Sequence, residues 1–283
     1  MRKVINLGFQ LASVLCAMIA CGILACIVGA IVVRGWPSVS WQFLTEQIRL
    51  VGADGGIFYN LIGTLILIST ALFLSTPLAL GLALVHGAYL RSEAGRQRLM
   101  LFLYLLNGVP SLLFGLFGFV VFVKYLGWGK SWLTGGILLG VMILPTVTVS
   151  LIERIRSLPR RYVEAASALG MNTSQVIWAV ILPQSVGALV TGSLIGLARA
   201  AGETAPILFT ATIFAGATLP KGVKESPVLS LPYHIFILAQ DSFDPAAGAK
   251  VWGTAVVLLA LVGFLSLIAL PLRMRIHEEA HHG

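Results

Sequence analysis

The sequence predicts an all-α integral membrane protein with six transmembrane helices. Hydrophobic residues make up 58% of the 283 residues and charged residues only 11%, whereas a typical soluble chain has about 25% charged residues. The mean hydropathy of +0.94 leaves too few polar side chains to cover a surface in water. Several uncharged stretches also reach the ~20 residues that a helix needs to cross the hydrocarbon core of a bilayer.

Six apolar stretches are candidates for these crossings. Five are uncharged throughout and cover residues 4–33, 57–85, 99–123, 131–152 and 251–272. The remaining one begins near Met171, is interrupted by Arg199 and Glu203, and resumes over residues 205–219. We expect it to form one helix through residues 184–215, with Arg199 near mid-depth. An even number of crossings puts both termini on the same side of the membrane.

The distribution of lysine and arginine among the connections favours cytoplasmic termini. With that orientation, 11 cations lie in the inner segments, which are residues 1–8, 86–98, 153–175 and 273–283. Only 7 lie in the longer outer segments, which are residues 34–56, 124–130 and 217–250. The net charge of +8 therefore indicates membrane topology and attraction to anionic membrane lipid. Nucleic-acid binding is not expected, because the cations do not form one basic stripe.

Two short motifs resemble sites of chemistry but lack residues that those sites need. Residues 129–131 read Gly-Lys-Ser, like the end of a phosphate-binding P-loop, but Lys124 stands where that loop needs its first glycine. Residues 277–281 read His-Glu-Glu-Ala-His, the spacing of a zinc protease helix, but no third ligand follows in the C-terminal tail. We therefore expect this chain to bind no cofactor and no metal.

The longest inner connection contains a short amphipathic helix. Pro159 suits a helix start, residues 164–169 are mostly good helix formers, and Gly170 suits a C-terminal stop at positive φ. The apolar side of this helix consists of Val163, Ala166, Ala168 and Leu169. The residues alone leave two interpretations: a helix that lies on lipid headgroups, or an exposed patch that a partner protein covers.

The same connection carries a longer motif. It reads Glu164-Ala165-Ala166, three residues, Gly170, nine residues, and then Val-Ile-Leu-Pro over residues 180–183. This pattern resembles the EAA loop of the binding-protein-dependent ABC importer permeases, in which the last part reads I-x-L-P; valine at the first position is a conservative departure. The resemblance implies a type I ABC importer permease core. It also implies that the 159–170 helix couples to an ATPase through Glu164, Ala165, Ala166 and Gly170.

Three further segments narrow the resemblance to the phosphate-specific permeases, and to their A-type subunit most of all. They read Ala-Arg-Ala-Ala-Gly-Glu-Thr-Ala-Pro over residues 198–206, Asn-Gly-Val-Pro-Ser over residues 107–111, and Asn-Leu-Ile-Gly-Thr over residues 60–64. The likeness covers roughly residues 57–272, which implies a permease domain there. Residues 1–56 would then form an accessory transmembrane helix with an outer loop, and residues 273–283 a cytoplasmic tail.

The resemblance also implies a function and partners. It describes a subunit of an ATP-driven phosphate importer in the cell inner membrane, which forms half of the translocation pathway. The implied partners are a homologous C-type permease, two copies of a cytoplasmic ATP-binding subunit, and a periplasmic phosphate-binding protein. ATP and Mg²⁺ belong to the ATPase, because this chain has no ATP-hydrolysing site. The residues implied to line the substrate pathway are Arg199, Glu203 and Thr204.

The chemistry of Arg199 can be considered without the family. An arginine deep in a bilayer costs about 2.5 to 3.5 kcal/mol on insertion scales, so Arg199 should face protein or a water-filled cavity. Glu203 follows one helical turn later, and Gly202 and Pro206 loosen the helix around it. Two compatible interpretations remain open: an Arg–Glu pair that braces a broken helix, or a cation that serves an anion pathway.

Three alternative functions follow from the same residues. The first is an ABC importer permease for another oxyanion. The second is an ion-coupled secondary anion carrier, which would need coupling-ion carboxylates within its spans, whereas Glu203 is the only acid well inside one. The third is an intramembrane metalloprotease, which would need ligands at membrane depth, whereas the His-Glu-Glu-Ala-His motif lies in the tail.

Overall fold

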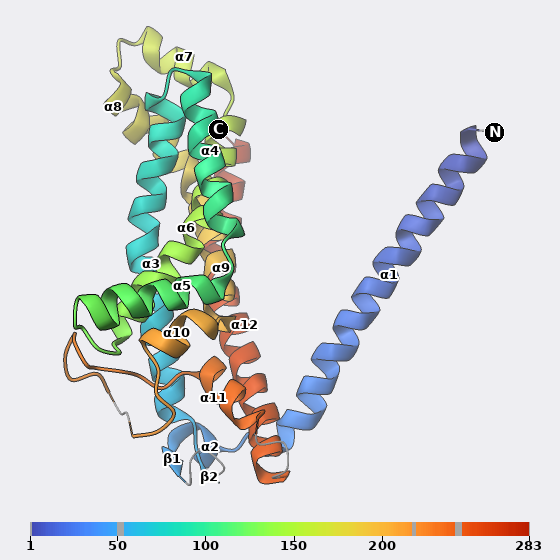
Figure 1. The fold of residues 1–283 in the computed structure, drawn as a ribbon. Helices are drawn as coiled ribbons and strands as arrows, with labels where there is room; N and C mark the ends of the chain where they lie inside the picture. The colour runs from blue at the N-terminus through green and yellow to red at the C-terminus, as the bar shows by residue number, and fades with distance from the viewer. Residues whose placement is uncertain (1, 50–53, 217–218, 241–244, 283) are drawn as a thin grey trace.

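The computed structural model describes residues 2–49, 54–216, 219–240 and 245–282. Within these ranges the chain forms an upright bundle of helices with one further helix that leans away from it (Figure 1). Five of the described helices are long and apolar enough to cross a membrane, and one bent helix pair can supply a sixth crossing. The predicted all-α membrane architecture is therefore confirmed.

The long elements are α1 (Arg2–Gly35), α3 (Phe58–Leu84), the bent pair α4 (Glu93–Gly108) and α5 (Ser111–Gly118), α6 (Trp132–Ser157), α9 (Leu182–Gly202) and α12 (Pro245–His282). Three of the described segments are π-helical. Val85–Tyr89 extends α3, Phe119–Tyr125 extends α5, and Ile177–Ile181 precedes α9. The short helices are α2 (Trp41–Thr45), α7 (Arg160–Ala168), α8 (Thr173–Val176), α10 (Ala205–Thr210), α11 (Leu231–Leu238) and a 3₁₀ turn at Trp36–Ser38. Strands β1 (Ile48–Arg49) and β2 (Asp54–Gly55) pair antiparallel.

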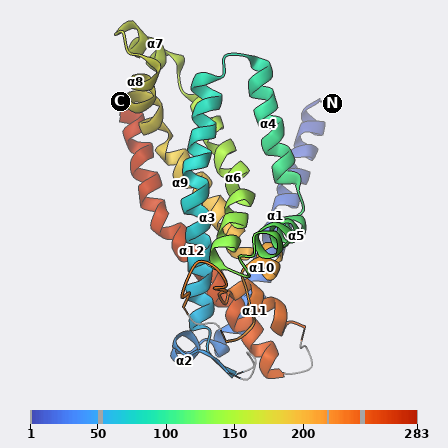
Figure 2. The same cartoon turned by 60° about the vertical axis from the view of Figure 1, so that its left-hand side comes forward.

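The centre of the bundle is the contact between α3 and α6, which run side by side (Figure 2). Small residues let the two helices approach, because a Cβ atom on Gly136 would collide with Thr70, and one on Gly140 would lie 3.1 Å from the carbonyl oxygen of Ala71. Contacts between membrane helices use small residues in this way because lipid supplies no hydrophobic force that drives apolar helices together. The side chains of Ala71 and Met142 are buried at this contact.

Helix α1 stands apart from the bundle over most of its length (Figure 1). None of the residues in the most apolar 18-residue stretch of α1 is buried, whereas 67% of the residues in the corresponding stretch of α6 are buried. The C-terminal end of α1 contacts α12, where a Cβ on Gly35 would collide with the backbone of Trp252 and the Arg34 guanidinium lies 5.1 Å from the Trp252 ring centroid. The division of the chain at residues 56 and 272 stays a prediction.

The third predicted span is not one straight helix. α4 ends at Gly108, Val109 and Pro110 are extended, and α5 begins at Ser111 after a bend of 87°. Pro110 accounts for the break, because proline has no N–H to donate and disfavours a helical conformation in the residue before it. The predicted crossing at residues 99–123 is therefore not one continuous helix, and the pair makes at most one broken crossing.

The fifth predicted span is also broken. α9 ends at Gly202, Glu203 is extended with φ −82° and ψ 127°, and α10 is a separate helix of six residues. A glycine at the end of one helix and Pro206 in the first turn of the next account for this boundary. The expectation of a continuous helix over residues 184–215 is therefore wrong. Arg199 lies in the last turn of α9 and not near the middle of a span.

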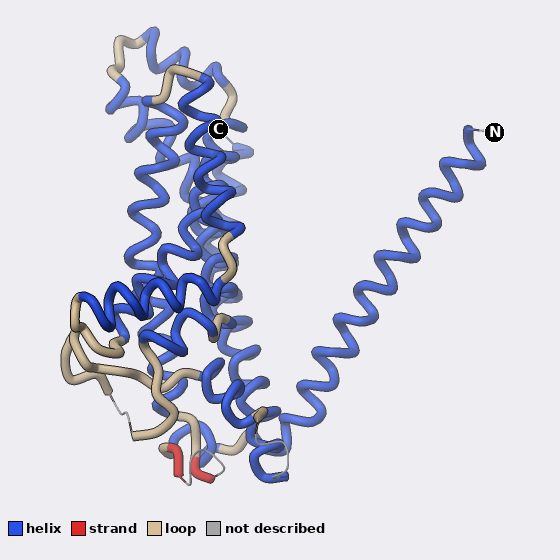
Figure 3. Tube along the Cα trace, in the orientation of Figure 1, coloured by secondary structure: helices blue, strands red, loops and turns tan. Residues whose placement is uncertain are grey.

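Most of the short elements lie at the two ends of the bundle, whereas α5 and α10 cross it at an intermediate height (Figure 1 and Figure 3). α7 and α8 lie at one end, and the start of α1 and the end of α12 point to this same end (Figure 1). α2, α11 and the β-hairpin lie at the opposite end. This arrangement agrees with the even number of crossings expected from the sequence.

Candidate functional site

The helix predicted between Pro159 and Gly170 is confirmed as α7. Pro159 precedes it in an extended conformation, and Gly170 follows it with φ +76°. The amide of Gly170 donates to the carbonyl of Ser167 at 3.0 Å, and the amide of Met171 donates to the carbonyl of Ala166 at 3.2 Å. This is the Schellman arrangement that ends many helices, and its left-handed residue favours glycine.

The four residues implied in ATPase coupling divide between the surface and the interior of this loop. Glu164 and Ala165 are exposed on α7, and Gly170 is exposed in the turn after it. Ala166 is only 4% exposed, because it packs with apolar residues of α8 and of the π-helical segment that follows α8. Ala166 therefore holds α7 against the bundle, whereas Glu164 and Ala165 are accessible to another protein.

The apolar side expected for α7 is divided in the same way. Val163 packs against the buried cluster around Ala166, whereas Leu169 is 82% exposed. Trp178, just after α8, is 69% exposed. Leu169 lies on the loop outside the candidate membrane spans, where a partner can cover a large exposed apolar side chain. Trp178 belongs to the candidate span Thr173–Gly202, where an exposed apolar side chain can face lipid.

The turn after α7 starts a new helix. Asn172 Oδ1 accepts a hydrogen bond from the amide of Gln175 at 2.9 Å, and Gln175 Oε1 accepts one from the amide of Asn172 at 2.8 Å. This capping box fixes the start of α8. From there α8, the π-helical segment and α9 form one continuous helical rod, Thr173–Gly202. At a rise of 1.5 Å per residue, the rod spans about 40 Å between Thr173 and Arg199.

Arg199 lies at the far end of this rod and connects the two broken spans. Its Nη1 donates to Oδ1 of Asn107, at the end of α4, over a distance of 2.6 Å. Its Nε lies 3.9 Å from Oε1 of Glu203. The Arg199 and Glu203 side chains are 32% and 22% exposed, so neither is sealed in the core. The Arg–Glu pair expected from the sequence is present, and Asn107 is an additional partner that the sequence did not identify.

The two breaks meet where α5 crosses α10. A Cβ atom on Gly115 of α5 would lie 2.6 Å from the carbonyl oxygen of Ala205 and 3.2 Å from Cα of Pro206, so these short helices are in direct contact. Thr204 lies between Glu203 and α10, and its side chain does not cap α10. A guanidinium has five N–H donors, and Arg199 directs a minority of them at Asn107 and Glu203. The remaining donors can serve an anion.

Of the two sequence motifs interpreted as lookalikes, the structure describes the side chains of the first only. Lys130 Nζ donates to the carbonyls of Leu208 and Thr212 at 3.0 Å each, so this cation caps the C-terminal end of α10. Burial lowers the pKa of Lys130. No described group of three or more His, Cys, Asp or Glu residues could hold a metal, and the side chains of residues 277–281 lie outside the described ones.

Comparison with solved structures assigns the fold. A chain of the MetNI methionine ABC transporter, in an inward facing conformation, superposes with a TM-score of 0.62 at 13% sequence identity. The match covers 78% of this chain and 97% of that chain. The type I importer permease fold implied by the EAA motif is therefore confirmed.

Comparison with curated proteins gives relatives that match over most of their length. A probable phosphate transport system permease protein, PstA, of Methanocaldococcus jannaschii is 34% identical over 88% of this chain and 86% of the relative. The phosphate transport system permease protein PstA 2 of Mycobacterium bovis is 30% identical over 94% of this chain and 86% of the relative. A probable ABC transporter permease protein of Bacillus subtilis, YqgI, is 27% identical over 94% of both chains.

The family match covers most of the permease core. Residues 75–276 match the family described as binding-protein-dependent transport system inner membrane component. That range includes α7, the helical rod and both broken spans. The chain therefore belongs to the family of inner membrane components of binding-protein-dependent transport systems, as a multi-pass permease subunit of an ABC importer.

Proposed function

We propose that this chain is the A-type permease subunit of an ATP-driven phosphate importer. The relatives from M. jannaschii and M. bovis are named as phosphate transport system permeases. In this chain the observation that carries the proposal is Arg199, a partly exposed guanidinium between two broken spans. Phosphate bears up to two negative charges, so a single fixed cation attracts it without trapping it.

The pathway half contributed by this chain contains Arg199, Glu203 and Thr204. Asn107 holds the guanidinium at the break, and Glu203 reduces the net positive charge, so an anion can leave as well as enter. Irregular backbone at membrane depth is tolerated where it lines a water-filled cavity, which suits the breaks after Gly108 and Gly202. A homologous C-type permease supplies the other half of the pathway.

Coupling proceeds through α7. Glu164 and Ala165 are exposed there for contact with a cytoplasmic ATPase, of which two copies bind ATP and Mg²⁺; this chain does not hydrolyse ATP. Closure of the ATPase pair displaces α7, and the continuous rod carries the movement about 40 Å to Arg199. In this arrangement α7 and both termini are cytoplasmic, and a periplasmic phosphate-binding protein delivers phosphate at the opposite end.

The proposal is tested with the complete transporter in liposomes. The chain is co-purified with its second permease and ATPase subunits and reconstituted with ATP inside, where α7 lies, and with the binding protein and radiolabelled phosphate outside. We expect uptake that requires ATP and that excess unlabelled phosphate competes away. Glu164→Lys should abolish ATPase association, whereas Glu93→Lys, which changes an exposed glutamate at the start of α4, should leave it intact.

Two results would contradict the proposal. If sulfate or another oxyanion competes with labelled phosphate better than unlabelled phosphate does, the substrate is that anion and not phosphate. Phosphate uptake by liposomes that contain this chain alone, driven by an ion gradient and without ATP, would instead support a secondary carrier.

A further inference from the structure

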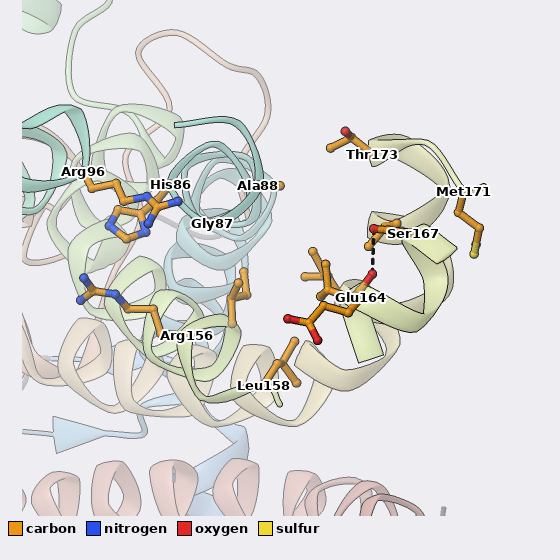
Figure 4. Close-up of a pocket in the computed structure, with 14 residues that line it drawn as sticks. His86, Gly87, Ala88, Arg96, Arg156, Leu158, Glu164, Ser167, Met171 and Thr173 are labelled. Atoms are coloured by element: carbon orange, nitrogen blue, oxygen red, sulfur yellow. Dashed lines mark hydrogen bonds between the residues drawn. The ribbon is translucent and has the colours of Figure 1, made fainter. Parts of the chain in front are cut away.

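A cavity of about 670 Å³ opens beneath α7, between this helix and the bundle (Figure 4). The ends of α3, α4 and α6 form one wall, and α7 and α8 form the other. The charged and titratable residues that line it are His86, Arg96, Arg156 and Glu164. Neither the transport pathway nor the ATPase contact uses the first three of these residues.

His86 is the buried member of this group. It lies in the π-helical segment at the end of α3, a type of distortion found often at functional sites, and it is 1% exposed. Neither of its ring nitrogens has a hydrogen-bond partner among the described residues. Both nitrogens are closed to solvent, so they reach a ligand in the cavity only when the side chain moves. Buried polar atoms without a partner are uncommon in native proteins, which favours such a movement once a ligand is present.

Two arginines supply positive charge to the same cavity. Arg96 Nε donates to the carbonyl of Leu90 at 2.8 Å, which anchors the side chain and leaves its terminal nitrogens for another acceptor. Arg156 comes from the last turn of α6. Neither arginine forms an ion pair with a carboxylate in the described part of the chain. Guanidinium groups bind phosphate oxygens with paired, charge-assisted hydrogen bonds.

We propose that His86, Arg96 and Arg156 form an inner anion site that binds a phosphate group. The group is either free inorganic phosphate or the headgroup of an anionic phospholipid, because both present the same oxygens at this end of the bundle. Two guanidinium groups and one carboxylate, that of Glu164, line the cavity, so its charge favours an anion.

Occupancy of the inner anion site regulates coupling. Glu164 and Ser167 of α7 line the same cavity, and a bound phosphate group repels the Glu164 carboxylate across it. Repulsion of this kind displaces α7 from its packed position and so reduces ATP-driven uptake when phosphate accumulates on the α7 side. This regulatory consequence rests on the proposed function, whereas the binding itself does not.

Binding is measured on the detergent-purified complex of all subunits, without ATP and without the binding protein. Radiolabelled inorganic phosphate is the probe. Every sample carries Arg199→Gln with Glu203→Gln, which removes the pathway cation without leaving an unpaired carboxylate. The test variant adds Arg96→Gln and Arg156→Gln. The matched control adds Arg91→Gln and Arg98→Gln, which remove the same charge from two exposed arginines outside the cavity.

We expect saturable phosphate binding that the control retains and that the test variant weakens at least tenfold, because each guanidinium supplies charge-assisted hydrogen bonds. Phospholipids retained after reconstitution in phosphatidylcholine with phosphatidylglycerol are identified in parallel by mass spectrometry. Phosphate binding assigns the site to the free anion. Retained phosphatidylglycerol that the test variant loses assigns it to the lipid headgroup. If the control complex binds neither, the proposal is overturned.

Two further results keep the test decisive. If the test variant loses the ATPase subunit while the control shows no phosphate or lipid binding, the cavity docks protein and the proposal is overturned. If the test variant does not assemble, the double variant Arg96→Lys with Arg156→Lys replaces it. This variant keeps both positive charges but loses the planar guanidinium groups that bind two phosphate oxygens at once, so it should bind phosphate more weakly than the control. Equal binding by the two variants overturns the proposal. Because the assay contains no transport step, a failure of binding is distinguishable from a failure of ATP-driven uptake.

Discussion

Replacing Gly170 with valine tests whether the α7–α8 turn carries coupling. Gly170 has φ +76°, and a Cβ atom there would meet no other atom within 4 Å. The cost of the substitution is therefore backbone strain without a steric clash, about 1 to 2 kcal/mol for a side chain in the left-handed region. A change of that size lowers the population of the native turn about 5- to 30-fold relative to its opened forms.

The assay compares Gly170→Val with Gly170→Asn and with Gly81→Val. Asparagine tolerates the left-handed region better than valine, so its effect should be smaller. Gly81 also has no atom within 4 Å of a Cβ but lies in α3 without a positive φ, so its variant serves as the control. We expect Gly170→Val to reach the membrane normally, to show faster hydrogen exchange over residues 160–176, and to lose at least fivefold in ATP-driven uptake.

Wild-type exchange and wild-type uptake in Gly170→Val would refute the reasoning. In that case the conformation of the turn would not matter to coupling, and residues 159–170 would be an ordinary surface loop.

Three further predictions concern stability. Gly115→Ala should lower the thermal unfolding temperature, because its Cβ would lie 2.6 Å from the carbonyl oxygen of Ala205 and overpacking costs about 1–3 kcal/mol; an unchanged temperature would contradict the close crossing of α5 and α10. Lys130→Met should speed hydrogen exchange over residues 205–212, because it removes two charge-assisted hydrogen bonds worth about 1.5–3 kcal/mol each; unchanged exchange would show that the cation does not hold α10. Burial, followed by the nearby charge of Lys250, lowers the pKa of His234 in α11 to about 4. Between pH 6.5 and 4 the unfolded chain therefore takes up a proton that the folded chain does not, and stability should fall by about 3 kcal/mol as the pH drops through this window. His234→Leu should remove that dependence, and a slope that persists in this variant would assign it to other groups.

The membrane architecture could be predicted because its signals are local. Uncharged stretches of about 20 residues have few alternatives to a membrane helix, and five of the described helices match such stretches. The bounds of α7 were also readable, because Pro159 and Gly170 act on the backbone next to them.

The two breaks could not be derived from hydropathy, because an apolar stretch remains apolar whether it is straight or bent. Pro206 indicated a weak point, but proline is tolerated in membrane helices when neighbouring groups satisfy the backbone. Pro77 and Pro145 lie inside α3 and α6 without interrupting them. What separates the two cases is the tertiary contact of α5 with α10 at Gly115, which no local pattern contains.

The partners of functional side chains were the least predictable part of the site. Glu203 was expected beside Arg199 because it follows four residues later, whereas Asn107 lies 92 residues away along the chain. The cavity beneath α7 also depends on contacts between distant helices, because His86, Arg96 and Arg156 come from three different ones. Local patterns cannot specify such convergence.

The pathway role of Arg199 is tested most directly by ATP-driven phosphate uptake in a charge swap, Arg199→Glu with Glu203→Arg. At 3.9 Å and an effective dielectric near 20, the pair is worth about 4 kcal/mol before desolvation, so either single variant should destabilise the protein. The swap keeps the attraction, and the amide nitrogen of Asn107 can donate to a carboxylate at position 199. We expect expression and assembly to recover while uptake stays at least tenfold below wild type, because the cation has moved out of α9. Full recovery of uptake would contradict a direct role of Arg199 in the anion pathway.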